Sequence, residues 1–180
     1  MKLKTKKVTR RLPEYQKIKE LFETAYPLDE RFPMWQLRLL QLLNRKIDFL
    51  AFYDEENLVG AAYIVYTDRM AIPLYLAVDA KLRSKGYGAF ILTQLKRRYL
   101  GRPLTVESEV IDKAADNYEQ RRRRMTFYER NGFKETGWFL TDSSGKYALL
   151  STAHNFSGKD YEEALLSFTH RLYKTTVTSV

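Results

Sequence analysis

The spacing of apolar residues along the chain alternates between the period of a helix and that of a strand. Apolar residues recur at helical spacing over Tyr15–Ala25 and Trp35–Leu43, after a first predicted strand at Leu3–Thr9. The period then shortens, and apolar, aromatic and β-branched residues predict three successive strands, at 48–53, 58–66 and 70–78. Pro73 lacks a ladder donor, so it indicates a bulge, a sheet edge or the true strand start, of which we favour the bulge.

The same alternation continues through the second half. A helix that ends at Gly101 precedes a strand at Leu104–Val110 and a strongly charged helix at Asn117–Asn131. Two strands joined by a polar turn and a terminal amphipathic helix follow, at 133–140, 146–153 and about 160–173. The pattern therefore predicts a mixed α/β chain.

Composition limits the class of protein. The 180 residues are 44% hydrophobic, which suits one soluble domain over 1–180, with a core at about 3–153 and a helical extension at about 158–174. The absence of Cys excludes disulfides and a Cys nucleophile, and with two distant histidines we expect no metal site. No apolar run approaches a membrane span and no secretory signal is visible, so we expect a cytoplasmic protein.

The formal charge of +9 is unevenly distributed. Residues 1–19 and 81–102 each carry a net +7, residues 20–80 carry −5, and residues 103–180 are neutral. Two basic blocks favour a polyanion, which could be nucleic acid, an acidic membrane surface or a phosphorylated cofactor.

The loop from Arg83 to Gly88 joins a predicted strand end to a predicted helix start. Free backbone N–H groups and the positive end of a helix dipole converge at such a point and bind phosphate. Gly86 and Gly88 let the backbone approach a pyrophosphate, while Arg83 and Lys85 supply positive charge. A tight turn with a solvated basic flank is the alternative. Ile91 replaces the third glycine of a dinucleotide fingerprint, and no P-loop is present.

A second segment, Phe127–Phe133, passes from a helix end through glycine into a strand. Together with Val78–Gly88, in this order, it resembles the GCN5-related N-acetyltransferase (GNAT) superfamily, whose pattern Gln/Arg-x-x-Gly-x-Gly/Ala is matched by Arg83, Gly86 and Gly88. The resemblance covers roughly Leu3 to Ala153. It implies a mostly antiparallel central sheet of six to seven strands with splayed parallel strands 4 and 5, about four flanking helices and an added C-terminal helix.

The resemblance also implies a cosubstrate, acetyl-CoA, and residues that bind it. Acyl-CoA would lie in a V-shaped gap between the strand ending at Val78 and the strand starting near Leu104. The main-chain groups of Leu76, Ala77 and Val78 would pair with the pantetheine arm. One of their N–H groups would also stabilise the thioester oxyanion. Further N–H groups would hold the pyrophosphate, at Arg83, Ser84, Lys85, Gly86, Tyr87, Gly88 and Ala89. Tyr128 would be the general acid for the departing thiolate.

One family position departs from the pattern. The Asn that usually contacts the cofactor, about seven residues before the tyrosine, is Arg121 here, and Asn117 lies one turn earlier. This contact is therefore lost or made differently.

A carboxylate is the expected base for the attacking amine. Glu107 and Glu109 lie at i and i+2 on one predicted strand and so share a face. We favour Glu107, which is nearer the expected cofactor gap. The alternative is that both face solvent or form ion pairs with the run Arg121–Arg124.

We therefore expect an N-acetyltransferase in which an amine attacks acetyl-CoA directly in a ternary complex. The alternatives are a non-catalytic acyl-CoA-binding module and a nucleic-acid-binding module, which would use the basic blocks but lacks interleaved aromatics and a recognisable reading motif. The amine acceptor, the acyl preference and a homodimer stay open, while the acidic 20–80 stretch favours a cationic amine.

Overall fold

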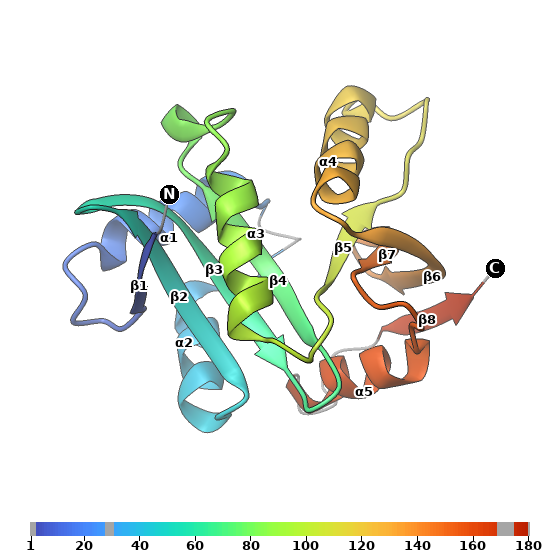
Figure 1. Cartoon of the computed structure of the whole chain (residues 1–180), viewed down its shortest axis with the longest axis horizontal. Helices are drawn as coiled ribbons and strands as arrows, with labels where there is room; N and C mark the ends of the chain where they lie inside the picture. The colour runs from blue at the N-terminus through green and yellow to red at the C-terminus, as the bar shows by residue number, and fades with distance from the viewer. Residues whose placement is uncertain (1–2, 28–30, 169–174, 180) are drawn as a thin grey trace. The chain divides into compact units, whose positions relative to one another are not determined.

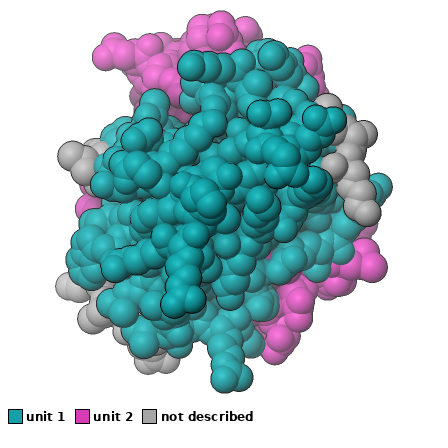
Figure 2. Space-filling model, turned by 90° about the vertical axis from the view of Figure 1, so that its left-hand side faces the viewer, with its two compact units in different colours: residues 1–66, 73–98 teal, residues 67–72, 99–180 magenta. Residues whose placement is uncertain are grey.

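The computed structural model describes residues 3–27, 31–168 and 175–179 (Figure 1). The chain divides into two compact units, coloured separately in Figure 2. The first unit comprises Met1–Tyr66 and Pro73–Arg98, and the second comprises Thr67–Ile72 and Tyr99–Val180.

The first unit is built on a four-stranded sheet with the order β1-β2-β3-β4. Its strands are β1 (Lys4–Lys7), β2 (Ile47–Asp54), β3 (Asn57–Tyr66) and β4 (Ala71–Val78), the last of which begins in the second unit. Its helices are α1 (Tyr15–Ala25), α2 (Met34–Leu43), the short 3₁₀ turn η1 (Ala80–Leu82) and α3 (Tyr87–Arg98). Helix α3 crosses one face of the sheet, and α1 and α2 lie on the other (Figure 1).

Aromatic residues fill the space between this sheet and the helices α1 and α2. Phe49 on β2 lies between Phe22 of α1 and Tyr63 of β3, with both pairs of ring centroids 5.3 Å apart in edge-to-face geometry. The Tyr63 hydroxyl donates to the Leu37 carbonyl of α2 at 2.9 Å. Burial of these large rings supplies the main driving force for packing the layer and fixes both helices against the sheet.

Helix α2 turns its apolar stripe outward. Trp35, Leu39, Leu42 and Leu43 are 61%, 45%, 73% and 65% exposed. The buried positions include two polar residues, Arg38 and Gln41. Arg38 donates to Gln41 and, at 2.8 Å, to the Val8 carbonyl. The inward face of α2 is thus set by hydrogen bonding as well as by hydrophobicity, which the apolar spacing of the sequence does not indicate.

Gly60 allows β3 to approach β4 and α3 closely. A Cβ at this position would lie 2.6 Å from the Ala77 carbonyl oxygen and 3.0 Å from Cδ1 of Ile91. Since the nearest atom belongs to the backbone, it cannot turn aside as a side chain would. The absent side chain therefore brings the end of β4 and the helix that follows it into close contact with the sheet.

The second unit contains another four-stranded sheet, with the order β5-β7-β6-β8. Its strands are β5 (Thr105–Glu109), β6 (Lys134–Asp142), β7 (Gly145–Ser151) and β8 (Thr176–Ser179), and its helices are α4 (Tyr118–Arg130) and α5 (Gly158–Phe168). The β6–β7 hairpin turns at 142–145, as predicted. Gly158, at the start of α5, packs so closely on Trp138 that a Cβ would lie 2.3 Å from the ring.

The predicted mixed α/β class is confirmed, with differences in detail. The described residues form eight strands in two sheets, where six to seven in one sheet were expected, and β8 was not predicted. Helix α5 ends at Phe168, and the rest of the predicted extension, 169–174, lies outside the described residues. Strand β4 is at the end of its sheet, which is the edge alternative for Pro73, while the bulge stays a prediction.

Two other expectations are left as they were. An isolated parallel bridge joins Ala71 to Leu104, but the splaying of the two strands stays a prediction. The single domain over 1–180 also stays a prediction.

Across the described residues, no helix has the length and apolar character that crossing a membrane requires. The same ranges contain no group of three or more His, Asp or Glu side chains placed to hold a metal ion.

Candidate active site

The segment between β4 and α3, residues 79–90, is a tightly turned loop that we call the cradle. Asp79 accepts a hydrogen bond from the Lys81 N–H at 2.9 Å and so starts the turn η1. Two residues then adopt left-handed conformations, Ser84 with φ 64° and Gly86 with φ 84°. The Arg83 and Lys85 N–H groups donate to the Ala80 and Leu82 carbonyls, both at 3.4 Å, so backbone hydrogen bonds hold these tight turns.

Helix α3 adds its own N-terminus to this cradle. The Phe90 N–H donates to the Gly86 carbonyl at 3.1 Å, so the N–H groups before Phe90 precede the helical hydrogen-bond ladder. Arg83, Ser84 and Lys85 lie at or near the surface, and the Tyr87 hydroxyl fastens the cradle to the β2 end by donating to Asp54 at 2.7 Å. The cradle is accessible, positively charged and fixed at one side.

At the end of β4, the outer strand of its sheet, one pair of main-chain groups is bonded to a side chain. The Tyr26 hydroxyl donates to the Leu76 carbonyl at 2.9 Å and accepts from the Leu76 N–H at 2.8 Å. Tyr26 directly follows α1, and its ring meets Tyr75 edge-on at 5.1 Å. No motif in the sequence singles out Tyr26.

In the second unit, Glu107 of β5 is held by a tyrosine of α5. The Tyr161 hydroxyl of α5 donates a hydrogen bond to its carboxylate. Burial raises the pKa of Glu107 to about 7; the Tyr161 hydrogen bond opposes this rise and the Asp142 charge adds to it. Burial and Glu107 in turn raise the pKa of Tyr161, which therefore stays protonated as a donor. A carboxyl group with a pKa near 7 can accept a proton at neutral pH and release it again.

Tyr128 lies on α4 in the same unit, among the aromatic rings of Phe127 and Phe133 at 5.3 and 5.5 Å. Burial raises the pKa of the Tyr128 phenol, Arg124 opposes that rise, and Glu107 reinforces it. The electrostatic influence of Glu107 thus reaches Tyr128. A phenol of this kind is protonated at neutral pH and can donate its proton.

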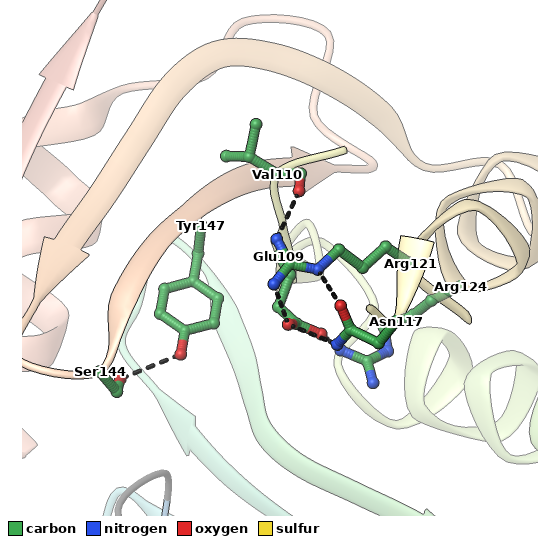
Figure 3. A network of polar contacts seen from close by, with 7 residues as sticks. All are labelled: Glu109, Val110, Asn117, Arg121, Arg124, Ser144 and Tyr147. Carbon is green, nitrogen blue, oxygen red and sulfur yellow. Dashed lines mark hydrogen bonds and ion pairs between the residues drawn. The ribbon is translucent and has the colours of Figure 1, made fainter. Parts of the chain in front are cut away.

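Glu109, the other candidate base, is bound to arginines (Figure 3). One carboxylate oxygen lies 3.0 Å from Arg121 and the other 2.7 Å from Arg124. Asn117 donates to Glu109 at 3.1 Å and accepts from Arg121 at 2.6 Å. Arg121 also donates to the Val110 carbonyl at 3.0 Å. Glu109 is therefore ion-paired with arginines, which is the alternative considered for this residue. Arg121 and Asn117, where the sequence departs from the family pattern, join α4 to β5.

The structure groups the predicted site residues into two sets. The ten cofactor candidates, Leu76–Val78 and 83–89, belong to one stretch of the first unit that runs from the end of β4 into α3. The two catalytic candidates, Glu107 and Tyr128, belong to the second unit. The gap predicted between Val78 and Leu104 involves residues of both units and stays a prediction.

Two tyrosines were missed by sequence reasoning. Tyr26 directly follows one amphipathic helix and Tyr161 stands on the apolar face of another, where such rings are typical of core residues. Their partners, Leu76 and Glu107, are 50 and 54 residues away. A faint signal was available, since a buried tyrosine hydroxyl normally needs a polar partner.

A family model described as the acetyltransferase (GNAT) domain matches residues 45–135, just over half of the 180 residues. The chain belongs to the GNAT acetyltransferase family. The match runs from β2 to the start of β6, so it includes the cradle, Glu107 and Tyr128. A comparison with curated proteins gives no significant match.

Solved structures of GNAT proteins share the fold. A protein from Bacteroides thetaiotaomicron assigned to the GNAT family is 22% identical with a TM-score of 0.74, covering 94% of this chain and 98% of its own. The aminoglycoside 6'-N-acetyltransferase of Enterococcus faecium is 16% identical, with a TM-score of 0.59 and coverage of 82% and 95%. A GNAT acetyltransferase from Elizabethkingia anophelis, solved with acetyl-CoA bound, is 12% identical, with a TM-score of 0.55 and coverage of 83% and 96%.

Proposed function

We propose that this GNAT protein is an acetyl-CoA-dependent N-acetyltransferase in which an amine attacks the thioester directly. The observation that carries the proposal is the match to the acetyltransferase (GNAT) domain over residues 45–135, which include Glu107 and Tyr128. Glu107 accepts a hydrogen bond from Tyr161 and has a pKa raised to about 7, and Tyr128 is a protonated phenol. The two groups supply a base and an acid for one transfer. The backbone cradle at Ser84 and Gly86 supports a substrate that carries a pyrophosphate.

In the proposed reaction Glu107 takes a proton from the attacking ammonium group. The amine nitrogen forms a bond to the thioester carbonyl carbon, and negative charge develops on the carbonyl oxygen, where a main-chain N–H at the end of β4 would stabilise it. The carbon–sulfur bond then breaks. As the amide forms, the nitrogen loses its second proton to solvent. Tyr128 donates its proton to the coenzyme A thiolate and regains one from solvent, and Glu107 releases the proton that it took, so that one proton is released overall.

The acceptor in this proposal is a cationic amine. Support comes from the net −5 over residues 20–80 and from related structures whose names point to polycations: an aminoglycoside acetyltransferase and a spermidine N-acetyltransferase chimera. A panel of simple amines, polyamines, aminoglycosides and peptides, with release of free thiol as the readout, would identify the acceptor class.

The basic N-terminal block, on which the nucleic-acid alternative depends, makes contacts within the first unit. Lys4 forms an ion pair with Glu56 at 2.6 Å, and Lys6 lies over the Tyr53 ring at 4.5 Å. Strand β1 ends its sheet, and lysines on an edge strand discourage pairing with other chains. Part of the basic N-terminal block therefore has partners within the fold.

Calorimetry provides the direct test of the proposed function. We expect the folded protein to bind acetyl-CoA at micromolar concentration, with an affinity that falls as salt is added because the cradle is exposed and charged. We expect thiol release only when an amine is also present. Absence of binding at high micromolar acetyl-CoA would exclude the enzyme, and binding without turnover on any amine would leave the non-catalytic alternative.

Tyr161→Phe tests how Glu107 is tuned. The phenol hydrogen bond favours the ionised carboxylate, so its loss raises the pKa of Glu107 further. We expect the midpoint of the rise of rate with pH to move up by about one pH unit, as for the loss of one hydrogen bond to a charged group. A rate profile recorded from pH 5 to 9 measures the shift.

The control for this change is Tyr147→Phe. Tyr147 lies on β7 of the same unit, and its hydroxyl forms a hydrogen bond with Ser144 at 2.9 Å (Figure 3). The substitution should leave the midpoint unchanged. If Tyr161→Phe lowers the rate equally at every pH, Tyr161 has only a packing role.

A further inference from the structure

Tyr26 makes an unusual pair of hydrogen bonds, because both of them go to one residue. Its hydroxyl accepts from the Leu76 N–H at 2.8 Å and donates to the Leu76 carbonyl at 2.9 Å. The backbone of Tyr26 is extended, with φ −132° and ψ 129°, immediately after α1. One side-chain hydroxyl thus makes the two hydrogen bonds that a residue of a neighbouring strand would make.

These Leu76 groups lie on the outer edge of β4. The Asp79 N–H donates to the Val59 carbonyl of β3 at 3.0 Å, and strand groups alternate in direction from one residue to the next. Residues 77 and 79 therefore turn toward β3, whereas residues 76 and 78 turn away from it. Since β4 ends the order β1-β2-β3-β4, no strand of this sheet bonds to Leu76 on that side.

The same edge is where the proposed function needs a ligand to bind. The pantetheine arm carries two amides, and the thioester carbonyl needs an N–H donor as charge develops on its oxygen. Only one partner at a time can occupy the Leu76 N–H with good geometry. The Tyr26 hydroxyl and the acyl-CoA arm are therefore competitors for one pair of main-chain groups.

We propose that Tyr26 is a displaceable partner of Leu76, which occupies the main-chain pair until acyl-CoA takes its place. This proposal rests on the proposed function, because it assumes that acyl-CoA binds along β4. The exchange conserves hydrogen bonds at Leu76, since two are broken and two can be formed. Binding must still move the Tyr26 ring from its contacts with Tyr75 at 5.1 Å and Phe22 at 6.1 Å.

The consequence is that the Tyr26–Leu76 contact lowers the apparent affinity for acyl-CoA. If the competent state is the one in which Tyr26 has left Leu76, the apparent affinity falls by the fraction of molecules in that state. Tyr26 would then also discriminate among ligands, because a ligand that cannot bond to Leu76 gains nothing by displacing it.

Tyr26→Phe keeps the ring and removes the competing hydroxyl. We expect coenzyme A to bind this variant about 3–10-fold more tightly in calorimetry, which corresponds to about one hydrogen bond of net strength. The matched control is Tyr75→Phe, which removes a hydroxyl of the same aromatic cluster, one that accepts from the Phe32 N–H at 3.2 Å. It should leave the dissociation constant unchanged.

A second measurement uses the unmodified chain and does not depend on the folding of a variant. With ¹³C-labelled tyrosine, we expect the Tyr26 ring resonance to shift when coenzyme A saturates the protein, while the Leu76 amide stays protected from hydrogen exchange in both states. An unchanged Tyr26 resonance, or a Tyr26→Phe variant that binds no more tightly, would overturn the displacement. Failure of the unmodified protein to bind coenzyme A would overturn the proposed function and this inference together.

Discussion

Glu107→Gln lowers kcat/KM for acetyl transfer by about 100- to 10,000-fold, the range that general acid–base catalysis usually contributes. Gln keeps the size of the side chain and can still accept the Tyr161 hydrogen bond, so the fold of the second unit is retained. The dissociation constant of acetyl-CoA should not change. The rate of the unmodified enzyme should rise with pH through about 7 as Glu107 ionises, and the variant should lack this rise.

Glu109→Gln is the matched control, because it makes the same change two residues along the same strand. It breaks the ion pairs with Arg121 and Arg124 and should therefore lower the free energy of unfolding. This loss should exceed the rise in activation free energy calculated from kcat/KM. If the two variants lose the same activity, or if Glu109→Gln loses more, Glu107 is not the base.

The pH dependence of the free energy of unfolding provides an independent test of the raised pKa of Glu107. Folding raises the pKa of Glu107 from 4.5 to about 7, so between these values the folded state binds more protons than the unfolded state. The stabilisation is complete below about pH 4.5 and is lost as pH rises through 7, by up to about 3 kcal/mol. Urea unfolding at pH 5 and pH 8 should show this loss in the unmodified protein and not in Glu107→Gln.

Gly86→Glu abolishes binding of acetyl-CoA, lowering the affinity at least about 100-fold. Two effects combine: the position has φ 84°, which a side chain tolerates poorly, and a carboxylate would stand in the proposed pyrophosphate site. Calorimetry with coenzyme A measures the loss, and thermal unfolding shows whether the variant remains folded.

Gly101→Glu separates these effects. Gly101 has the same φ of 84°, a Cβ added there would meet no atom within 4 Å, and the residue lies beyond the opposite end of α3. We expect this variant to bind acetyl-CoA normally. Equal weakening by both substitutions would mean that backbone strain, rather than a phosphate site at Gly86, causes the loss.

The cofactor candidates could be proposed from sequence because they lie close together in it. Backbone conformation depends on the residue itself and on its neighbours, so the turn at Gly86 and the start of α3 can be predicted from the local sequence. The same local logic gave the helices and most strands. It missed β8, a four-residue strand, since short segments carry little periodicity.

The choice between Glu107 and Glu109 was different. Both carboxylates share a strand, a face and a similar neighbourhood in sequence, and the sequence could favour Glu107 only through the resemblance. The structure separates them by their partners: a phenol of α5 holds Glu107, and two arginines of α4 hold Glu109. Each of these contacts joins distant parts of the chain.

The sequence by itself determined the family, the order of the helices and of the strands up to β7, and the glycine-containing loop that precedes α3. Only the tertiary structure decided which carboxylate is hydrogen-bonded to a phenol, which face of α2 is buried, and that Tyr26 occupies the main-chain groups of Leu76. The physical reason is that local conformation follows from adjacent residues, whereas burial and hydrogen-bond partners depend on residues about 50 positions away that folding brings together.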